Sequence, residues 1–255
     1  MFKLTKYELR KTRTTLLIAA ACFALLELAY ILGLALHKED LAGGSASFLV
    51  LFAVFSYLFF LILAIMNYSK EMNSKSSYLI FMTPNTPLAI ISAKMLMILL
   101  VGLTSLLVYA LFCWLDIRLL IAFYPDAEMT GDLLAGFAKG LGVDLPELGF
   151  TLLALLIAMI VTFFLLVTLA YLAITLSATF LQNFRFKGWI SCILFLAFFM
   201  AATWIDNHLI PALYPNPATW QQLWIGIAPS CLFYIILMIL ATFACSVLLE
   251  KKVSL

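Results

Sequence analysis

Six apolar runs, each long enough to cross a bilayer, dominate this 255-residue sequence. They extend over about 15–36, 47–66, 88–115, 148–180, 188–205 and 228–249. Roughly 20 consecutive apolar residues in a helix cross the hydrocarbon layer of a membrane, which is about 30 Å thick. We therefore expect an all-α integral membrane protein in which six transmembrane helices form a single domain over residues 1–255.

The composition excludes a soluble fold. Hydrophobic residues make up 65% of the chain and charged residues only 11%, against about 25% charged residues in an average soluble domain. All five cysteines lie in apolar runs without a C-x-x-C pair, so neither a disulfide framework nor a zinc site is indicated. The first apolar run exceeds the roughly 7 to 15 residues of a signal peptide, which predicts a retained first span.

Basic residues predict the orientation, because Lys and Arg concentrate in cytoplasmic loops. Of the 15 Lys and Arg residues, all but Lys38, Arg118 and Lys139 fall on one side of the predicted spans. That side holds both termini, which we place in the cytoplasm. We expect a multi-pass protein of a bacterial cell membrane.

Residues 2–14 form a predicted interfacial helix ahead of the first span. Its basic residues recur at helical spacing and share one stripe, namely Lys3, Lys6, Arg10 and Arg13. Such a stripe suits anionic lipid headgroups. Simple anchoring of the chain by the positive-inside rule explains it equally well.

A polar segment interrupts the chain between the second and third runs, in "YSKEMNSKSSYLIFMTPNTPLAIISAK" (residues 68–94). Glu71 and Lys75 form an i, i+4 pair on a predicted short helix that Pro84 and Pro87 end. Its apolar end, "YLIFM", suits either a helix lying in the headgroup layer or a plug for a partner's groove.

This segment, the basic lead "YELRKTR" and the six spans together resemble the permease subunit of an ABC-2-type ABC transporter. The resemblance implies that the segment 70–83, here called the coupling segment, is a coupling helix that docks on a separate ATPase subunit. The implied contact residues are Lys70, Glu71, Lys75, Ser76, Tyr78, Leu79, Phe81, Met82 and Thr83. It also implies that the interfacial helix touches the ATPase and that two permease copies, identical or closely related, pair with two ATPases.

The chain has no nucleotide site of its own in this interpretation. No Gly-Lys dipeptide occurs, so the phosphate-binding P-loop motif is absent from the sequence. ATP and Mg²⁺ would therefore bind to the partner ATPase, and this chain would be a transport subunit rather than an enzyme. The mostly apolar spans favour a hydrophobic or amphipathic cargo, and the layout is similar to permeases that export amphipathic peptide toxins.

Three features are candidates for the translocation pathway. Glu27 lies in the first span, where a carboxylate needs a partner or a proton. Its role is either in the pathway or at a subunit interface, or it makes a structural hydrogen bond. An aromatic stripe in the second span either lines a route or packs against neighbours, and comprises Phe48, Phe52, Phe55 and Phe59. A polar stripe in the fourth span either bonds to its own helix or faces a cavity, and comprises Thr168, Tyr171 and Thr175.

The connection 206–229, with four prolines among Trp and Tyr residues, predicts an outer re-entrant hairpin or an ordinary interfacial loop. The isolated residues His37 and His208 offer no metal constellation.

The main rival to a permease is an ion-coupled transporter or channel that uses Glu27. An intramembrane enzyme is disfavoured, because neither H-E-x-x-H nor G-x-S-x-G occurs and no membrane-embedded pair of carboxylates is expected. A membrane scaffold without transport activity remains an alternative.

Overall fold

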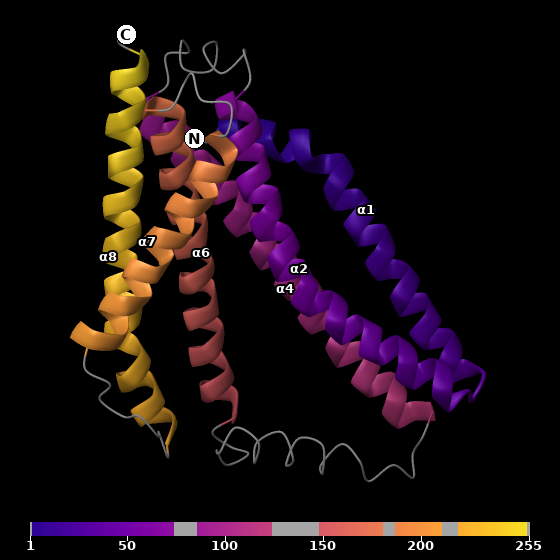
Figure 1. Ribbon diagram of the computed structural model, residues 1–255. Coiled ribbons are helices and arrows are strands. Elements are labelled where there is room, and N and C mark those ends of the chain that lie inside the picture. The colour runs from indigo at the N-terminus through magenta and orange to yellow at the C-terminus, as the bar shows by residue number, and fades with distance from the viewer. Residues whose placement is uncertain (1, 74–85, 124–147, 181–186, 211–218, 254–255) are drawn as a thin grey trace. The chain divides into compact units, whose positions relative to one another are not determined.

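The structure is a computed structural model that describes residues 2–73, 86–123, 148–180, 187–210 and 219–253. These residues form six helices and no strand (Figure 1). The helices are α1 (Phe2–Ala35), α2 (Glu39–Asn73), α4 (Pro87–Phe123), α6 (Leu148–Phe180), α7 (Lys187–Leu209) and α8 (Trp220–Val253). All six are long and apolar enough to cross a membrane, which confirms the predicted all-α membrane fold.

Most of these helices are longer than a bilayer requires. The 37 residues of α4 correspond to about 55 Å of helix at 1.5 Å per residue, against about 30 Å of hydrocarbon. Both the predicted interfacial stretch and the first predicted span fall within the single helix α1. Likewise α8 begins at Trp220 and continues through Pro229, so it includes the end of the predicted outer hairpin. The middle of that hairpin lies outside the described residues.

The chain divides into two compact units. Unit 1 comprises residues 1–62 and 92–133, and unit 2 comprises residues 63–91 and 134–255. Unit 1 therefore contains α1 with most of α2 and α4, and unit 2 contains α6, α7 and α8 with the remaining turns of α2 and α4.

A tight turn in unit 1 joins α1 to α2 (Figure 1). His37 has a φ of 50°, its N–H donates to the carbonyl of Leu34, and the N–H of Lys38 donates to the carbonyl of Gly33. This pair of bonds is the Schellman ending of a helix, with His37 in the left-handed position that glycine usually takes. Gly33 lets the start of α2 approach, because a Cβ there would lie 2.7 Å from the backbone nitrogen of Ala42.

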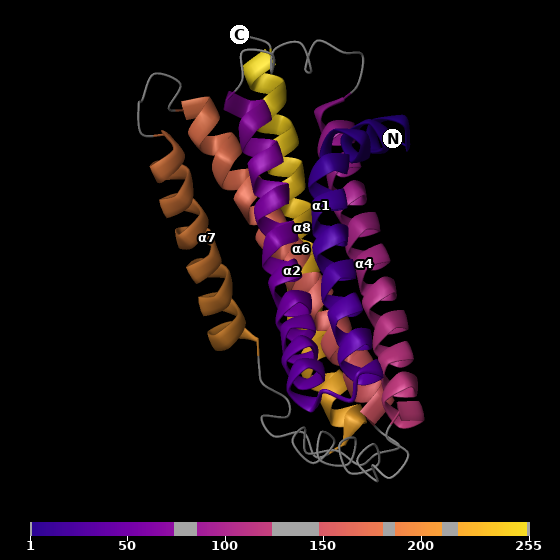
Figure 2. The same cartoon turned by 90° about the vertical axis from the view of Figure 1, so that its right-hand side faces the viewer.

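The ribbon of α1 changes direction after its first turns (Figure 2). In these first turns the hydroxyl of Thr12 donates to the carbonyl of Glu8 at 3.1 Å, a type of back-bonding that often bends helices. The exposed residues of these turns include Lys3, Lys6, Arg10 and Arg13, whereas Thr5, Glu8 and Thr12 are buried. The basic stripe and the buried polar residues thus occupy different faces of α1.

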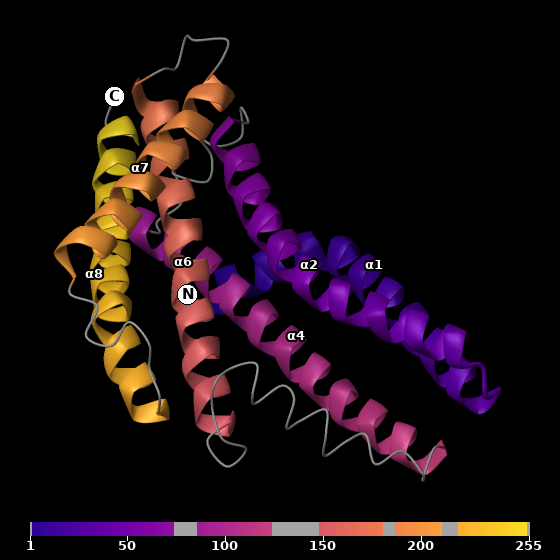
Figure 3. The same ribbon diagram turned by 60° about the horizontal axis from the view of Figure 1, so that its bottom comes forward.

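Helix α6 is the centre of unit 2 and packs against both α7 and α8 (Figure 3). Its residues between Leu165 and Ala178 are mostly buried, and several are alanines. Small side chains let neighbouring helices approach closely in membrane proteins. Leu165 and Leu169 form a core with Ala202 of α7, against which Tyr234 and Leu237 of α8 pack.

Candidate functional site

Four contacts in unit 1 show that α1 and α4 run parallel to each other in a constant register. Lys94 meets Glu8, Tyr109 and Phe112 meet Phe23, Asp116 meets Glu27 and Phe123 meets His37. The residue numbers in these pairs differ by 86 to 89 throughout. From the start of the two helices to their end, the contacts between α1 and α4 are in turn ionic, aromatic, acidic and aromatic.

The first contact is a buried ion pair. The Nζ of Lys94 lies 2.6 Å from Oε1 of Glu8, with both side chains almost fully buried. Moving such charges out of water is costly, and a partner of opposite charge at hydrogen-bond distance offsets part of that cost. The pair fixes the first turns of α1 to the start of α4, the helix that follows the coupling segment in the chain. Sequence reasoning treated Lys94 only as an orientation signal and did not single out Glu8.

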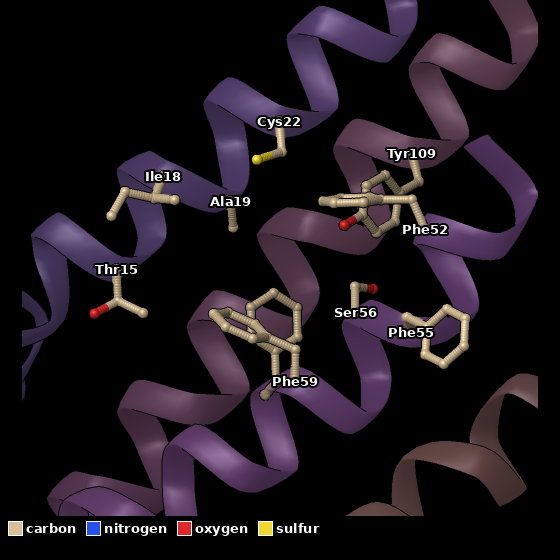
Figure 4. Close-up of a pocket in the computed structure, with 10 residues that line it drawn as sticks. Thr15, Ile18, Ala19, Cys22, Phe52, Phe55, Ser56, Phe59 and Tyr109 are labelled. Carbon is tan, nitrogen blue, oxygen red and sulfur yellow. The ribbon is translucent and has the colours of Figure 1, made fainter. Parts of the chain in front are cut away.

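An apolar pocket of about 310 Å³ follows next along the helices (Figure 4). Its walls come from α1, α2 and α4, and its lining residues are Thr15, Ile18, Ala19, Cys22, Phe52, Phe55, Ser56, Phe59, Phe60 and Tyr109. Figure 4 shows Ala19 and Cys22 of α1 facing Phe52 and Phe59 of α2. The volume lies at the lower end of the range for small-molecule sites.

Three members of the predicted aromatic stripe line this pocket, whereas the fourth, Phe48, is exposed on α2 and is not among the lining residues. The stripe therefore both lines a cavity and packs against α1, through a tilted contact between Phe23 and Phe52 with 6.0 Å between ring centroids. Phe23 also contacts Tyr109 and Phe112 of α4, at 5.1 and 5.3 Å.

Two carboxyl groups meet beyond the pocket. The Glu27 side chain is within hydrogen-bonding range of Asp116. Glu27 is only 4% exposed, and its Oε2 has no hydrogen-bond partner among the described residues. Two carboxyl groups can share a hydrogen bond only if one of them carries a proton, because an ionised carboxylate has no donor. The partner that the sequence required for Glu27 is thus a second acid, and this pairing of two carboxyl groups was not expected from the sequence.

The ionic and acidic contacts lie about one hydrocarbon thickness apart. Lys94 and Asp116 are 22 positions apart on α4, which corresponds to about 33 Å along the helix. A hydrocarbon layer of about 30 Å fits between them. The pocket lies between these two levels, and the carboxyl pair lies near the layer's far boundary from the ion pair.

The polar stripe of α6 is packed inside unit 2. Thr168 donates to the carbonyl of Leu165 at 2.8 Å, and Thr175 donates to the carbonyl of Tyr171 at 2.6 Å. Tyr171 stacks on Tyr68 of α2 with 4.1 Å between ring centroids, and the Tyr68 hydroxyl lies 2.8 Å from that of Thr175. The stripe therefore links α6 to α2 within this unit.

A second polar contact in unit 2 joins α7 to α8. The hydroxyl of Tyr234 donates to Oδ2 of Asp206 at 2.7 Å, while Oδ1 of Asp206 is buried without a partner among the described residues. Nothing in the sequence indicated this bond.

Most of the coupling segment lies outside the described residues. Lys70 and Glu71 belong to the last turn of α2, where Lys70 is exposed and Glu71 is buried. The remaining predicted contact residues, Lys75, Ser76, Tyr78, Leu79, Phe81, Met82 and Thr83, are not described. Across the part of the chain that is described, no group of three or more His, Cys, Asp or Glu residues could hold a metal ion.

Comparisons with protein-family models, curated proteins and solved structures found no match to this chain. The functional assignment therefore rests on the six helices, which indicate a multi-pass membrane protein of the transport class.

Proposed function

We propose that the chain is the transmembrane permease subunit of an ATP-driven exporter, which a separate ATPase drives through alternating access. Its cargo is hydrophobic or amphipathic. A second copy or a close relative of the chain completes the transmembrane part, and the ATPase subunits hold ATP and Mg²⁺.

The buried pair between Glu8 and Lys94 carries this proposal. It fixes the basic turns of α1 to α4, and α4 begins directly after the coupling segment. A push on the coupling segment reaches α4 through the chain, and the ion pair transmits it to α1. Because α1 and α4 keep one register along their length, they would move together relative to α2, and such a movement changes the walls of the pocket that the three helices line.

The apolar pocket supports the proposed class of cargo. Aromatic rings from α2 and small residues from α1 line it, so it suits hydrocarbon or aromatic groups better than sugars or ions.

Co-purification with candidate ATPase subunits tests the proposal. Wild-type chain should retain an ATPase in detergent, and the Tyr78→Asp, Phe81→Asp double variant of the coupling segment should lose it. The matched control is Leu36→Asp, Leu41→Asp, which adds the same two charges near the opposite end of α2, at exposed positions. It should insert and retain the ATPase. Equal retention by the coupling-segment variant, or no ATPase with the wild type, would overturn the proposal.

Ion-coupled transport is the second candidate function, favoured by the Glu27–Asp116 contact. Intramembrane carboxyl groups that pair with one another are typical of proton relays. A carrier of this kind works without an ATPase. It predicts that an imposed pH gradient drives transport in vesicles without ATP and that Glu27→Gln abolishes this transport.

A further inference from the structure

The pocket and the carboxyl pair are consecutive in unit 1, with Phe23 between them. Phe23 contacts Phe52 and Tyr109, which line the pocket. Glu27 lies one helical turn beyond Phe23 on α1, and Asp116 lies one turn beyond Phe112 on α4. Phe23 and its neighbour Phe112 therefore lie between an apolar cavity and a buried acidic site.

The acidic site has a carboxyl oxygen that could accept a bond from a cationic group. Oε2 of Glu27 is buried and has no hydrogen-bond partner among the residues that the structure describes. Its ionisable neighbours among the described residues include the phenol of Tyr30 and the thiol of Cys113, and neither supplies a cation at neutral pH.

The nearest basic residue along α4 does not neutralise the pair. Arg118 follows Asp116 by two positions, which turns it about 200° around the helix. Its guanidinium lies over the ring of Trp114, 5.5 Å from the ring centroid. The charge of Arg118 is thus held on a different face of α4.

We propose that unit 1 binds lipophilic monocations, whose apolar part occupies the aromatic pocket and whose cationic group reaches the Glu27–Asp116 carboxyl pair past Phe23. Such a ligand matches both halves of the site. Its apolar groups fill a cavity lined by Phe52, Phe55 and Phe59, where aromatic faces also attract a cation. Its charge takes the place of the proton that the two carboxyl groups otherwise share.

This inference rests on the proposed function only in naming a class of cargo, because binding to the chain itself needs no ATPase. It is tested on the purified full chain in nanodiscs of phosphatidylcholine. Equilibrium dialysis measures the binding of 4-phenylbutylamine, whose ammonium group is charged at neutral pH and separate from its ring, with empty nanodiscs subtracted. 4-Phenylbutanol is the comparator, since it has the same ring and chain and no net charge.

The wild-type chain should bind 4-phenylbutylamine saturably and at least tenfold more tightly than the neutral comparator. Glu27→Gln and Asp116→Asn should each weaken cation binding at least tenfold and leave the comparator unchanged. Ala19→Phe, which narrows the pocket, should weaken the binding of both compounds. The matched control Asp40→Asn removes an exposed acid of the same unit and should bind both compounds as the wild type does.

Several outcomes would overturn the inference: no binding above that of empty nanodiscs, equal affinity for the cation and the neutral compound, or full cation binding by both carboxyl variants. If Glu27→Gln does not yield folded chain, judged by gel filtration, the test depends on Asp116→Asn alone. Weakened cation binding by that variant supports the inference, and full cation binding overturns it. A negative result here leaves the ATPase co-purification result unaffected, so the failures of the two proposals are distinguishable.

Discussion

The Nζ of Lys94 lies 2.6 Å from Oε1 of Glu8, across two helices that then run in register to Phe123 and His37. Removing one partner of a buried ion pair typically costs about 3 to 5 kcal/mol of stability. We therefore expect Glu8→Met and Lys94→Met each to destabilise the chain by about that amount in unfolding by SDS in mixed micelles.

The double variant Glu8→Met, Lys94→Met completes a double-mutant cycle, which measures how much the two side chains stabilise each other. Because both charges leave together, it should be clearly more stable than the sum of the single losses implies. Lys6→Met, at an exposed position of α1, serves as the control and should change stability by less than about 0.5 kcal/mol. Additive losses in the double variant would show that the two side chains do not stabilise each other.

Gly33 is predicted to be intolerant of substitution because of its neighbour in α2. A Cβ at this position would lie 2.7 Å from the nitrogen of Ala42, so Gly33→Ala forces a backbone shift that costs about 1 to 3 kcal/mol. Gly102→Ala is the matched control, since nothing lies within 4 Å of its added Cβ. It should stabilise α4 by up to about 1 kcal/mol. Melting temperatures in one detergent compare the two, and equal shifts would refute the close approach.

Tyr68 is predicted to stabilise unit 2 through both its ring and its hydroxyl. Tyr68→Phe keeps the stacking on Tyr171 but removes the bond to Thr175, which should cost about 1 kcal/mol. Tyr68→Ala also leaves a cavity and should cost about 3 to 5 kcal/mol. Tyr7→Phe, at a side chain that is 67% exposed, is the control. Indistinguishable unfolding of Tyr68→Ala and wild type would exclude this packing.

The bond between Tyr234 and Asp206 predicts that removing one partner destabilises the chain more than removing both. Tyr234→Phe leaves the Asp206 carboxylate without its donor and should cost about 1 to 3 kcal/mol. Combining it with Asp206→Leu removes both polar partners, so most of the lost stability should return. A Tyr234→Phe variant as stable as the wild type would mean that this bond contributes nothing to the packing of α7 on α8.

Helix positions were predictable from the sequence because hydropathy and length decide them. The predicted fourth span, residues 148–180, coincides with α6, and each other predicted span overlaps one helix. The pairing of Glu27 with Asp116 was not predictable, because it depends on the register between helices whose residues are 89 positions apart. One signal for Glu8 was present: Thr5, Glu8 and Thr12 recur at helical spacing, offset from the basic stripe.

The pocket illustrates the same limit. A stripe of phenylalanines on α2 was visible in the sequence, but the small residues of α1 opposite them, Ala19 and Cys22, give the stripe a cavity to line. Which residues face one another is a property of tertiary packing, so the stripe alone favoured neither a route nor a packed interface.

The turnover of the partner ATPase, measured with and without this chain in lipid nanodiscs, tests the permease proposal most directly and requires no knowledge of the cargo. The account predicts that wild-type chain changes the rate of ATP hydrolysis severalfold, that Tyr78→Asp, Phe81→Asp abolishes this change, and that Leu36→Asp, Leu41→Asp preserves it. A rate of ATP hydrolysis that is the same with and without the chain would contradict the account.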